Sequence, residues 1–504
     1  MTKGFVYLVG AGPGRADLIT VRGAEVLKKA DCIIYDKLAN PALLRFAPKD
    51  AEIIPVPKRV GPGSFTQQEI NEVLIEKAAE GKSVVRLKGG DPCIFGRCTE
   101  EAVLCAEAGI DFEIVPGVTA GIAAGDYTGI ILTDREYSSQ VVFVTGHEAE
   151  GKQKSSIDWD LLARFRGTIV FYMAVGNLGF IAKQLMDNGM AGATPAAVVA
   201  DATFPTQRVV KAPLAAISDT CKRQEIEPPA VVVIGAAADS DMRLNWFMKK
   251  PLFGKTIVVT RDVQGNARFA AKIIQQGGSP IEFPTIEIRP LTRANEFLRA
   301  LAKFSEYDWV IFTSANGVII FFDCLCELGK DGRVFGSAKV AAIGSETAAK
   351  LAEFGIKADF VPDVFTGEEL GKQLLKAENL RAKEVLLLRS RLASEELPEL
   401  LRQGGAKVDD VPVYDIVTVT GRSARLVEKI AQGKIDWLTF ASPSSAKAFF
   451  EHIPPDSVSS SSVKVASIGP VTSEQLRKLD VSVDVESSEH TIDGLLEAIE
   501  RAYG

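Results

Sequence analysis

The sequence predicts an α/β protein in two parts, each built on largely parallel sheets that helices cover. Short apolar runs such as VVRL, FEIV, VVFVTG and AVVVIG alternate with stretches of helical periodicity along the whole chain, and this alternation is typical of strand–helix–strand units. Between a strand-like run that ends at Gly235 and the next one, KTIVVTR, lies the segment WFMKKPLFG, from Trp246 to Gly254. We place a domain boundary in this segment.

The second part contains an internal repeat. YDWVIFTSANGVIIFF, from Tyr307, matches IDWLTFASPSSAKAFF, from Ile435, and KVAAIGSETAAKLAEFGI, from Lys339, matches KVASIGPVTSEQLRKLDV, from Lys464. A third pair, FTGEELGKQL and TIDGLLEAIE, follows in the same order. Two copies are too few for a solenoid, so we expect two lobes with a ligand-binding cleft between them.

Composition argues against several classes of function. A net charge of −7 over 504 residues disfavours a general nucleic-acid binder and a membrane-surface protein. No apolar run is long enough to span a bilayer, and the amino terminus lacks the pattern of a signal peptide, so we expect a cytoplasmic protein. The seven cysteines form no C-x-x-C pair and there are three histidines, which predicts reduced thiols and no metal site.

The chain opens with FVYLVGAGPGRADLIT, an apolar run that turns at three glycines into a helix-like stretch. A dinucleotide fingerprint has the form G-x-G-x-x-G, but here the fourth position is Pro13 and the sixth is Arg15. Since proline has no backbone N–H, the turn offers one donor fewer to a pyrophosphate. The pattern favours a ligand that brings adenosine without a phosphate tail; the alternative is an ordinary strand-to-helix turn whose glycines only relieve steric crowding.

Two further loops follow predicted strands. In VVRLKGGDPCIFGR the strand breaks at Gly89 and Gly90, which let a ligand approach the backbone closely, and Asp91 adds a carboxylate. VPGVTAGIAAG places Thr119 and Ala120 at a predicted helix start. Each loop alone is more commonly structural. Together with the opening turn, however, both are expected at the carboxyl edge of one sheet, where α/β proteins bind ligands.

Nine segments of the first part follow one another in the order of a known family. They are GAGPGRADLIT, YDKL, KRVG, VVRLKGGDPCIFGR, VPGVTAGIAA, TGIILTDREYSSQVVFVTGH, YMAVGNL, TPAAVVADATFPTQR and PPAVVVIG. They resemble the uroporphyrinogen-III C-methyltransferases of the tetrapyrrole methylase family, and the resemblance covers residues 1–248. It implies α/β subdomains at about residues 1–118 and 119–248 that bind S-adenosylmethionine between them and release S-adenosylhomocysteine, and a homodimer through this part.

The resemblance also implies roles for particular residues. Cofactor contacts are implied for Pro13, Gly89, Gly90, Asp91, Ile94, Thr119, Ala120, Met173 and Ala202. Asp36 of YDKL matches the proton acceptor of the family and Lys58 of KRVG the proton donor; by themselves these residues are typical of a strand-end cap and a solvated lysine. The sequence departs from the family at Arg15, where an acidic residue is common. It departs again at Asp126, Asp134 and Ala202, which replace a frequent proline, histidine and glycine.

Residues 251–504 contain segments of another family, and the second part itself is expected at residues 255–504, after a linker at 249–254. The segments are PLFGKTIVVTR, EFPTIEI, YDWVIFTSANGV, KVAAIGSETA, VPVYDIV, IDWLTFASPSS and VASIGPVT, and they resemble the uroporphyrinogen-III synthases. The resemblance implies two discontinuous lobes, residues 255–285 with 415–504 and residues 286–414. It further implies a cleft lined by the hydroxyl groups of Thr347, Tyr414 and Thr472, with Ser314 and Asn316 nearby. Thr347 and Thr472 are also candidates for helix N-caps after Gly344 and Gly469.

Together the two resemblances imply a bifunctional enzyme that acts on tetrapyrroles. The second part would close hydroxymethylbilane, with inversion of ring D, to uroporphyrinogen III. The first part would methylate this product twice with S-adenosylmethionine to precorrin-2, for siroheme and cobalamin. Two alternatives stay open: an NAD-dependent oxidoreductase, which the glycine turn favours and Pro13 opposes, and a methylase joined to a two-lobed module that only binds a solute. No metal, nucleic acid or membrane is expected as a partner.

Overall fold

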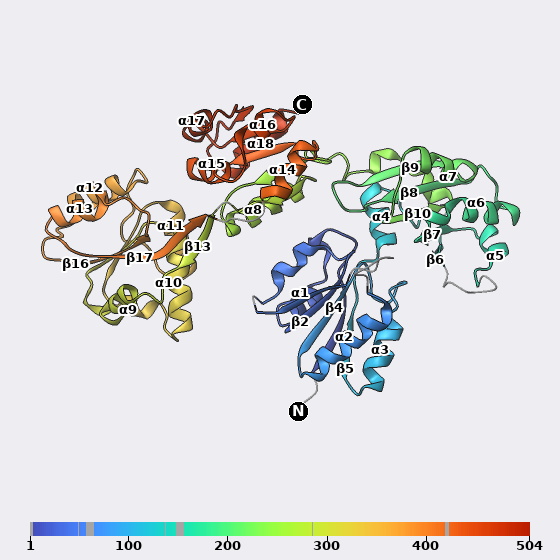
Figure 1. Cartoon of the computed structure of the whole chain (residues 1–504), viewed down its shortest axis with the longest axis horizontal. Coiled ribbons are helices and arrows are strands. Elements are labelled where there is room, and N and C mark those ends of the chain that lie inside the picture. Colours follow the sequence, from blue (N-terminus) through green and yellow to red (C-terminus); the bar gives the residue numbers. More distant parts are fainter. Residues whose placement is uncertain are drawn as a thin grey trace. The chain divides into compact units, whose positions relative to one another are not determined.

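The computed structural model describes residues 4–48, 50–56, 65–136, 138–147, 156–284, 286–418 and 423–503. The chain divides into two compact units, Met1–Thr256 with Lys272–Ser279 and Ile257–Ala271 with Pro280–Gly504, whose helices and strands are labelled in Figure 1. Within the described ranges no helix is long and apolar enough to cross a membrane.

The amino-terminal sheet has five parallel strands in the order β3-β2-β4-β1-β5. The strands are β1 (Phe5–Gly10), β2 (Cys32–Asp36), β3 (Glu52–Val56), β4 (Ser83–Lys88) and β5 (Asp111–Val115), and the helices are α1 (Val21–Leu27), α2 (Gln67–Ala79) and α3 (Cys98–Glu107). Neighbouring residues of β1 enter different cores, because Val6 and Leu8 pack with α2 and α3 whereas Val9 packs with α1. Helices therefore cover both faces, and the carboxyl ends of the strands remain as the edge where ligands bind.

The second sheet of the first unit is mixed and has the order β6-β7-β10-β8-β9. Its strands are β6 (Val141–Thr145), β7 (Thr168–Tyr172), β8 (Pro195–Ala200), β9 (Arg208–Pro213) and β10 (Ala230–Ile234), and the helices are α4 (Ala120–Thr128), α5 (Trp159–Ala163), α6 (Leu178–Asp187) and α7 (Leu214–Arg223). β6 and β7 are parallel, but β10 pairs antiparallel with β7 and β8, and β9 pairs antiparallel with β8. The prediction of a largely parallel sheet is wrong here, because β8 and β9 form a hairpin and β10 returns between β7 and β8.

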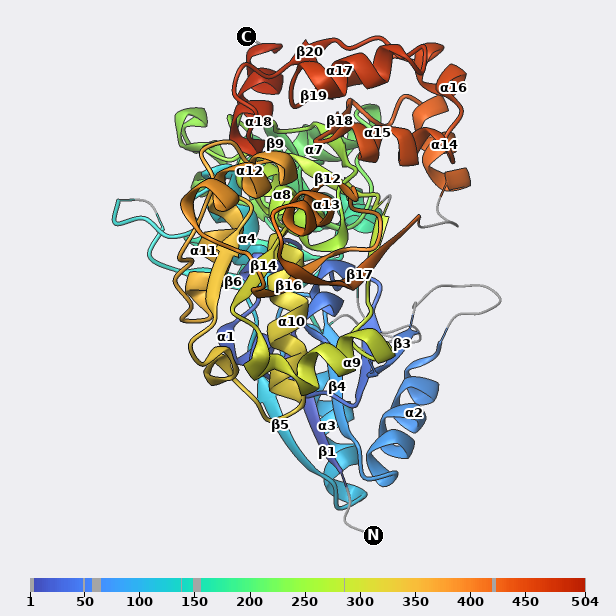
Figure 2. The ribbon, with the colours of Figure 1, turned by 90° about the vertical axis from the view of Figure 1, so that its left-hand side faces the viewer.

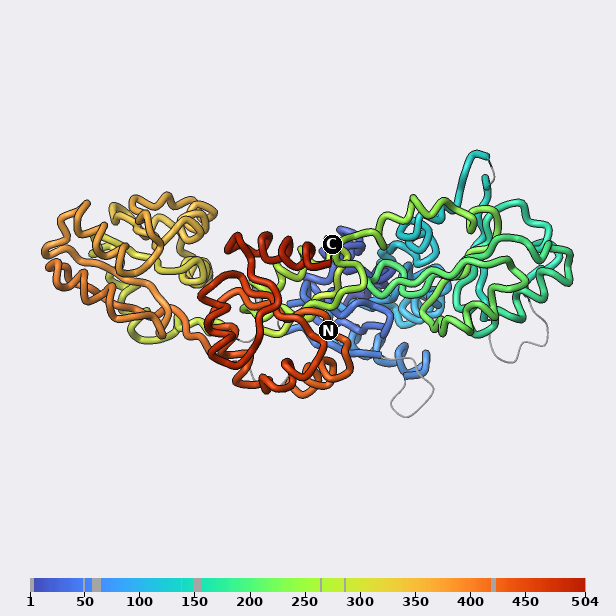
Figure 3. Tube along the Cα trace, turned by 90° about the horizontal axis from the view of Figure 1, so that it is seen from above, coloured from blue at the N-terminus to red at the C-terminus, as the bar shows by residue number. Residues whose placement is uncertain are grey.

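The second unit contains two sheets, one in each lobe (Figure 2), and Figure 3 follows the backbone of the same chain. The first lobe has the sheet β12-β11-β18-β19-β20 and the second lobe has β13-β17-β16-β14-β15. The first lobe comprises β11 (Thr256–Val259), α8 (Val263–Gln275), β12 (Ser279–Glu282), α14 (Ser423–Ala431), β18 (Trp437–Phe440), α15 (Pro443–Phe450), α16 (Pro455–Ser459), β19 (Lys464–Ser467), α17 (Pro470–Arg477), β20 (Val485–Glu486) and α18 (Ile492–Arg501). The second lobe comprises β13 (Ile286–Pro290), α9 (Asn295–Ala302), β14 (Trp309–Phe312), α10 (Ala315–Glu327), β15 (Lys339–Ala342), α11 (Ser345–Glu353), α12 (Gly367–Ala377), β16 (Glu384–Ser390), α13 (Glu396–Gln403) and β17 (Lys407–Thr418).

The lobes are joined by β13 and β17, which pair antiparallel. The chain enters the second lobe at β13 and leaves it at β17, so these neighbouring strands contain both crossings (Figure 1). Two adjacent connections of this kind allow lobes to move about a hinge.

The repeat in the sequence is confirmed as a repeat in structure. Trp309 and Trp437 begin β14 and β18, and Lys339 and Lys464 begin the neighbouring strands β15 and β19. In each copy the lysine ammonium lies over the tryptophan ring, 5.4 Å from its centroid in one lobe and 5.5 Å in the other. The two lobes therefore share side-chain contacts as well as the order of their elements.

Candidate functional sites

Three loops at the carboxyl ends of β1, β4 and β5 are joined to one another by hydrogen bonds. Gly12 and Gly90 exchange backbone hydrogen bonds of 3.2 Å and 2.8 Å, and the Asp91 carboxylate accepts the Gly117 N–H at 3.0 Å. A Cβ at Gly10 would lie 2.6 Å from the Cα of Gly117 and 2.7 Å from the carbonyl oxygen of Gly90. The predicted meeting of the loops is confirmed, and glycine is needed where their backbones touch.

Gly90 leaves a space beside a helix start. Its φ is +68°, and a Cβ built on it would lie 3.8 Å from the nearest heavy atom, the backbone nitrogen of Ala120. Ala120 is the first residue of α4, and Thr119 is its N-cap without a side-chain capping bond. A nucleoside that hydrogen-bonds to backbone donors fits this arrangement, because the first N–H groups of a helix have no partner within it. S-adenosylmethionine is such a ligand.

Asp91 has a structural explanation. Its Oδ1 accepts the N–H groups of Cys93 at 2.8 Å and Ile94 at 3.2 Å, and its Oδ2 accepts the N–H of Gly117. The carboxylate therefore holds its own loop in a turn and ties it to the loop after β5. Ile94 is partly buried against the core beneath the second sheet.

Met173 and Ala202 come from the second sheet. β7 and β8 run in one direction, because both pair antiparallel with β10, so both residues follow strand ends at the same edge. Met173 is 52% exposed and Ala202 is 9% exposed. The hydroxyl of Tyr172 lies 2.8 Å from that of Thr119 and accepts the Gly121 N–H at 2.8 Å. Tyr172 therefore joins the end of β7 to the start of α4.

Left-handed backbone conformations gather at these loops. Five non-glycine residues after β4, β7 and β8 have φ between +48° and +74°: Phe95, Arg97, Met173, Asp201 and Thr203. Such conformations cost about 1–3 kcal/mol each and concentrate at ligand sites. Arg15, one of the departures from the family pattern, donates its backbone N–H to the hydroxyl of Thr203 at 3.0 Å. The opening turn is thereby bonded to the loop that contains Ala202.

Asp36 belongs to a chain of charged groups that the sequence did not predict. Arg86, Lys88 and Glu101 are 0%, 1% and 0% exposed. Arg86 donates to Asp36 Oδ1 at 2.5 Å and to Glu101 Oε1 at 3.1 Å, and Lys88 Nζ lies 2.5 Å from Glu101 Oε2. Gln67 also donates to Glu101, at 3.1 Å. The side chain of Asp36 is 20% exposed, so Asp36 is the member of this chain of charges that reaches solvent.

Four other positions named from the sequence have simpler outcomes. Lys58 lies outside the described residues. The carbonyl oxygen of Asp126 accepts a hydrogen bond from the indole of Trp246 at 2.9 Å, and burial raises the pKa of its carboxyl group. Asp134 exchanges backbone hydrogen bonds with Ser138. Pro13 lies between Gly12 and Gly14, which have φ of +80° and +157°, so the turn requires both glycines.

Replacing Gly90 with valine tests the space beside α4. A β-branched side chain at a positive φ is strained, and its atoms would enter the region between Gly90 and Ala120. We expect the affinity for S-adenosylhomocysteine to fall by about tenfold or more, measured by calorimetry. Gly189→Val is the control, because Gly189 also has a positive φ but a Cβ there meets nothing within 4 Å. Equal affinity in the two variants would contradict a ligand at Gly90.

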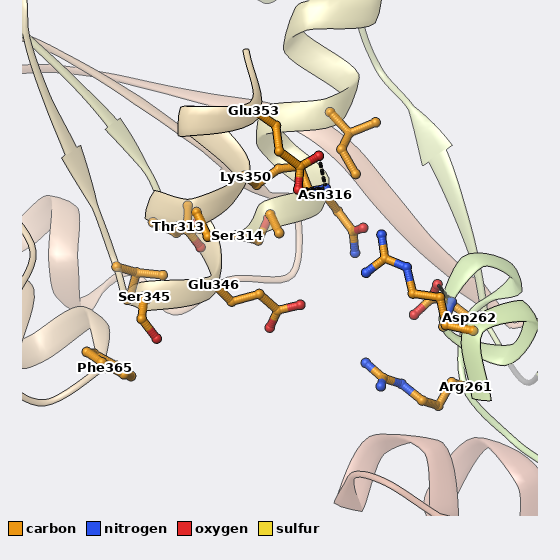
Figure 4. A pocket seen from close by; sticks show the side chains of 18 residues that line it. Arg261, Asp262, Thr313, Ser314, Asn316, Ser345, Glu346, Lys350, Glu353 and Phe365 are labelled. Atoms are coloured by element: carbon orange, nitrogen blue, oxygen red, sulfur yellow. Dashed lines mark hydrogen bonds and ion pairs between the residues drawn. The ribbon is translucent and has the colours of Figure 1, made fainter. Parts of the chain in front are cut away.

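The second unit holds a cavity of about 560 Å³ lined by both lobes (Figure 4). The first lobe contributes Arg261, Asp262, Gly265 and Arg268. The second lobe contributes Thr313, Ser314, Ala315, Asn316, Ile319, Ile343, Gly344, Ser345, Glu346, Thr347, Ala349, Lys350, Glu353 and Phe365. The helices α10 and α11 both begin at its wall, so their positive ends face the space. The cavity suits a polar ligand that reaches both lobes.

Tyr414 lies at the border of a smaller, neighbouring cavity of about 260 Å³. This cavity shares Thr313 and Ile343 with the larger one. The Tyr414 hydroxyl donates to Ser314 Oγ at 3.0 Å, and burial is the main cause that raises the pKa of the phenol. The phenol therefore stays protonated and is held beside the wall of the larger cavity.

The two threonines of the repeat differ in their surroundings. Thr347 lines the larger cavity, whereas Thr472 does not; both are 3% exposed. The alternative that they cap helices is wrong, because the N-caps of α11 and α17 are Gly344 and Gly469 and no side chain caps either helix. The structure thus brings Thr347, Ser314, Asn316 and, through Ser314, Tyr414 together, and leaves Thr472 apart from them.

Comparison with known proteins gives matches for both parts. A family model described as "Tetrapyrrole (Corrin/Porphyrin) Methylases" matches residues 6–218, and one described as "Uroporphyrinogen-III synthase HemD" matches residues 267–497. The "Porphyrin biosynthesis protein HemD" of Ruminiclostridium josui is 38% identical over 99% of this chain and 98% of its own length. The "Uroporphyrinogen-III C-methyltransferase" of Bacillus subtilis is 39% identical over 70% of this chain and 72% of its own length. The "S-adenosyl-L-methionine-dependent uroporphyrinogen III methyltransferase" of Methanosarcina barkeri is 47% identical over 46% of this chain and 91% of its own length.

This chain joins an α/β unit with glycine loops at its strand ends to a duplicated, two-lobed unit. With these matches, the two units define a fused enzyme of tetrapyrrole biosynthesis. The chain belongs to the tetrapyrrole methylase family in its amino-terminal half and to the uroporphyrinogen-III synthase family in its carboxyl-terminal half. Membership of these families argues against the alternative of an NAD-dependent oxidoreductase.

Proposed function

We propose that the chain converts hydroxymethylbilane to precorrin-2 in two stages. The carboxyl-terminal half closes the linear tetrapyrrole with loss of water and inversion of ring D, which gives uroporphyrinogen III. The amino-terminal half then methylates uroporphyrinogen III twice. The observation that carries the proposal is the match to a HemD protein over 99% of the chain. Two structural features support it: the hydrogen-bonded loops at the strand ends of the first unit and the cavity that both lobes of the second unit line.

In the methylase half, S-adenosylmethionine supplies the methyl group when it is bound. The residues that would hold it are those of the glycine loops, the start of α4 and the ends of β7 and β8. Their hydrogen bonds to one another fix them before the ligand arrives, and such preorganisation favours alignment of two reacting molecules. Asp36 would take the proton that the substrate pyrrole loses, and Arg86 holds its carboxylate in place.

In the synthase half, the substrate carries eight carboxylates and must be bound by a protein of net charge −7. Local donors can supply the attraction, and α10 and α11 present their N-terminal N–H groups at the cavity. Tyr414 would donate its proton to the departing hydroxyl group, because its phenol is protonated and lies beside the cavity. Movement of the lobes at β13 and β17 would admit the linear substrate.

The direct test supplies hydroxymethylbilane and S-adenosylmethionine to the whole protein. Precorrin-2 is the expected product, and uroporphyrinogen III is expected when S-adenosylmethionine is omitted. Only the spontaneous isomer, uroporphyrinogen I, would form if the two-lobed half merely bound a solute. Sedimentation of the same sample would test the homodimer that the methylase family implies.

Among the hydroxyl groups of the synthase half, Tyr414 should matter most. We expect Tyr414→Phe to slow ring closure by roughly tenfold to a hundredfold, since it alone is proposed to act on the leaving group. Thr347→Ala and Thr472→Ala should each cost less than about tenfold, because one lost hydrogen bond weakens binding that many donors share. The rates are measured as uroporphyrinogen III above the isomer I background. If Tyr414→Phe closed the ring at the normal rate while a threonine variant was inactive, the assignment of the main role to Tyr414 would be wrong.

A further inference from the structure

The first lobe presents two guanidinium groups to the larger cavity. Arg261 follows β11 and Arg268 lies in α8, and both line the space. Figure 4 shows Arg261 extending from its loop into the open region, where Glu346 points from the opposite wall. Arginine is well suited to bind carboxylates, because its planar group can donate two parallel hydrogen bonds.

These two cations differ from the other basic residues at the cavities. Lys350 is bonded to Glu353 at 2.7 Å, and Arg389 is bonded to Asp410 at 2.5 Å and to Glu395 at 2.6 Å. By contrast, no carboxylate in the described part of the chain forms an ion pair with Arg261 or Arg268. Their charges are therefore available to a ligand.

The loop that carries Arg261 has a fixed shape. The Oδ1 of Asn266, which is fully buried, accepts the N–H of Arg261 at 2.7 Å. The N–H of Asn266 donates to the carbonyl of Asp262 at 2.8 Å, and the Asp262 carboxylate accepts the Gly265 N–H at 2.9 Å. A Cβ at Gly265 would lie 2.9 Å from Nε of Arg261, so glycine gives this side chain its room. The loop holds the base of the arginine in place before any ligand binds.

The charges on the two walls complement an anionic ligand. Lys350 and Glu353 neutralise each other. Arg261 and Arg268 on one wall and the helix starts of α10 and α11 on the other then face two carboxylates, those of Asp262, which also accepts the Gly265 N–H, and Glu346. A ligand with many carboxylates can therefore be bound from both lobes at once.

We propose that Arg261 and Arg268 bind carboxylate groups of the linear tetrapyrrole and so determine the affinity of the synthase half for its substrate. This assignment rests on the proposed function of that half. It places the side-chain cations for the substrate on the first lobe, while the second lobe supplies backbone donors and Tyr414. Substrate binding then joins the two lobes, since neither wall alone offers both kinds of donor.

The test compares Arg261→Gln, Arg268→Gln and the double variant with wild type in uroporphyrinogen III formation. A hydrogen-bonded charge pair of this kind corresponds to roughly tenfold to a hundredfold in affinity. We therefore expect each single variant to raise KM for hydroxymethylbilane by about tenfold or more, with kcat changed less than about threefold. Arg261→Lys should recover part of the loss, because it keeps the charge. Arg425→Gln is the control, since Arg425 is an exposed residue of α14 outside the cavity and should leave KM unchanged.

A second measurement tests directly whether the two arginine side chains contact a ligand. Phenylglyoxal modifies accessible arginines, and peptide mass spectrometry identifies which ones react. Uroporphyrin III, a stable tetrapyrrole with eight carboxylates, should protect Arg261 and Arg268 but not Arg425. The assignment of the arginines would be overturned if the variants had a normal KM and uroporphyrin III did not protect the two arginines from phenylglyoxal. If the wild type still formed uroporphyrinogen III in that case, the proposed function would stand. Protection without any uroporphyrinogen III formed by the wild type would refute the proposed function and retain the arginines as an anion site.

Discussion

Asp36→Asn is expected to lower the rate of methylation by roughly two to four orders of magnitude, the usual contribution of a general base. Asparagine keeps the shape of the side chain, and its oxygen can still accept the hydrogen bond that Arg86 donates to Asp36 at 2.5 Å. It cannot take a proton from the substrate. The rate is measured in single turnovers with S-adenosylmethionine in excess, so that product release does not limit it.

Two controls separate this loss from damage to the fold. The affinity for S-adenosylhomocysteine should persist in Asp36→Asn, because Asp36 is not among the residues assigned to the cofactor. Asp111→Asn should leave the rate unchanged, since Asp111 is an exposed aspartate at the opposite end of the same sheet, where β5 begins. A nearly normal rate for Asp36→Asn would show that this carboxylate only pairs with Arg86.

The loops of the methylase half could be predicted because their signals are local. Glycines that end strands indicate close backbone approach, and parallel strands bring their carboxyl ends to one edge. The hydrogen bonds between Gly12 and Gly90 and between Asp91 and Gly117 bear this out. The mixed second sheet was missed for the converse reason: apolar runs such as AVVVIG give no sign of strand direction.

The buried charges could not be predicted from the same patterns. In VVRLKGG the alternation places Arg86 and Lys88 on one face of β4, which is a usable signal, but a charged face normally indicates solvent. Only the fold shows that Glu101, from α3, meets both cations. The role of Arg261 and Arg268 could not be predicted either, because the cavity wall opposite them comes from the other lobe. The threonines show the reverse error, since their spacing after glycine suggested caps that the helices do not use.

The buried charges lead to a prediction about stability. Arg86→Met removes a fully buried guanidinium that bonds to Asp36 and Glu101, and methionine fills a similar volume. Breaking a buried pair by removing one partner costs about 3–5 kcal/mol, and the lower end of this range applies here, because Lys88 still pairs with Glu101 and the Asp36 side chain is 20% exposed. We expect the free energy of unfolding of the methylase half to fall by about this amount. The unfolding step of that half is identified in calorimetry as the one that S-adenosylhomocysteine shifts upward.

The matched control is Arg22→Met, which also removes an arginine bonded to a glutamate. Arg22 lies 2.7 Å from Glu113, but the two side chains are 49% and 35% exposed, so the loss should be far smaller than for Arg86→Met, because exposed ion pairs contribute little to stability. Arg22 also lies 3.6 Å from a second carboxylate, that of Glu25, so burial rather than the number of partners accounts for the expected difference. The double variant Arg86→Met with Glu101→Gln should cost less than the sum of its single changes, because the two groups contact each other. Equal losses for Arg86→Met and Arg22→Met would mean that water reaches Glu101 and Asp36 and replaces the guanidinium.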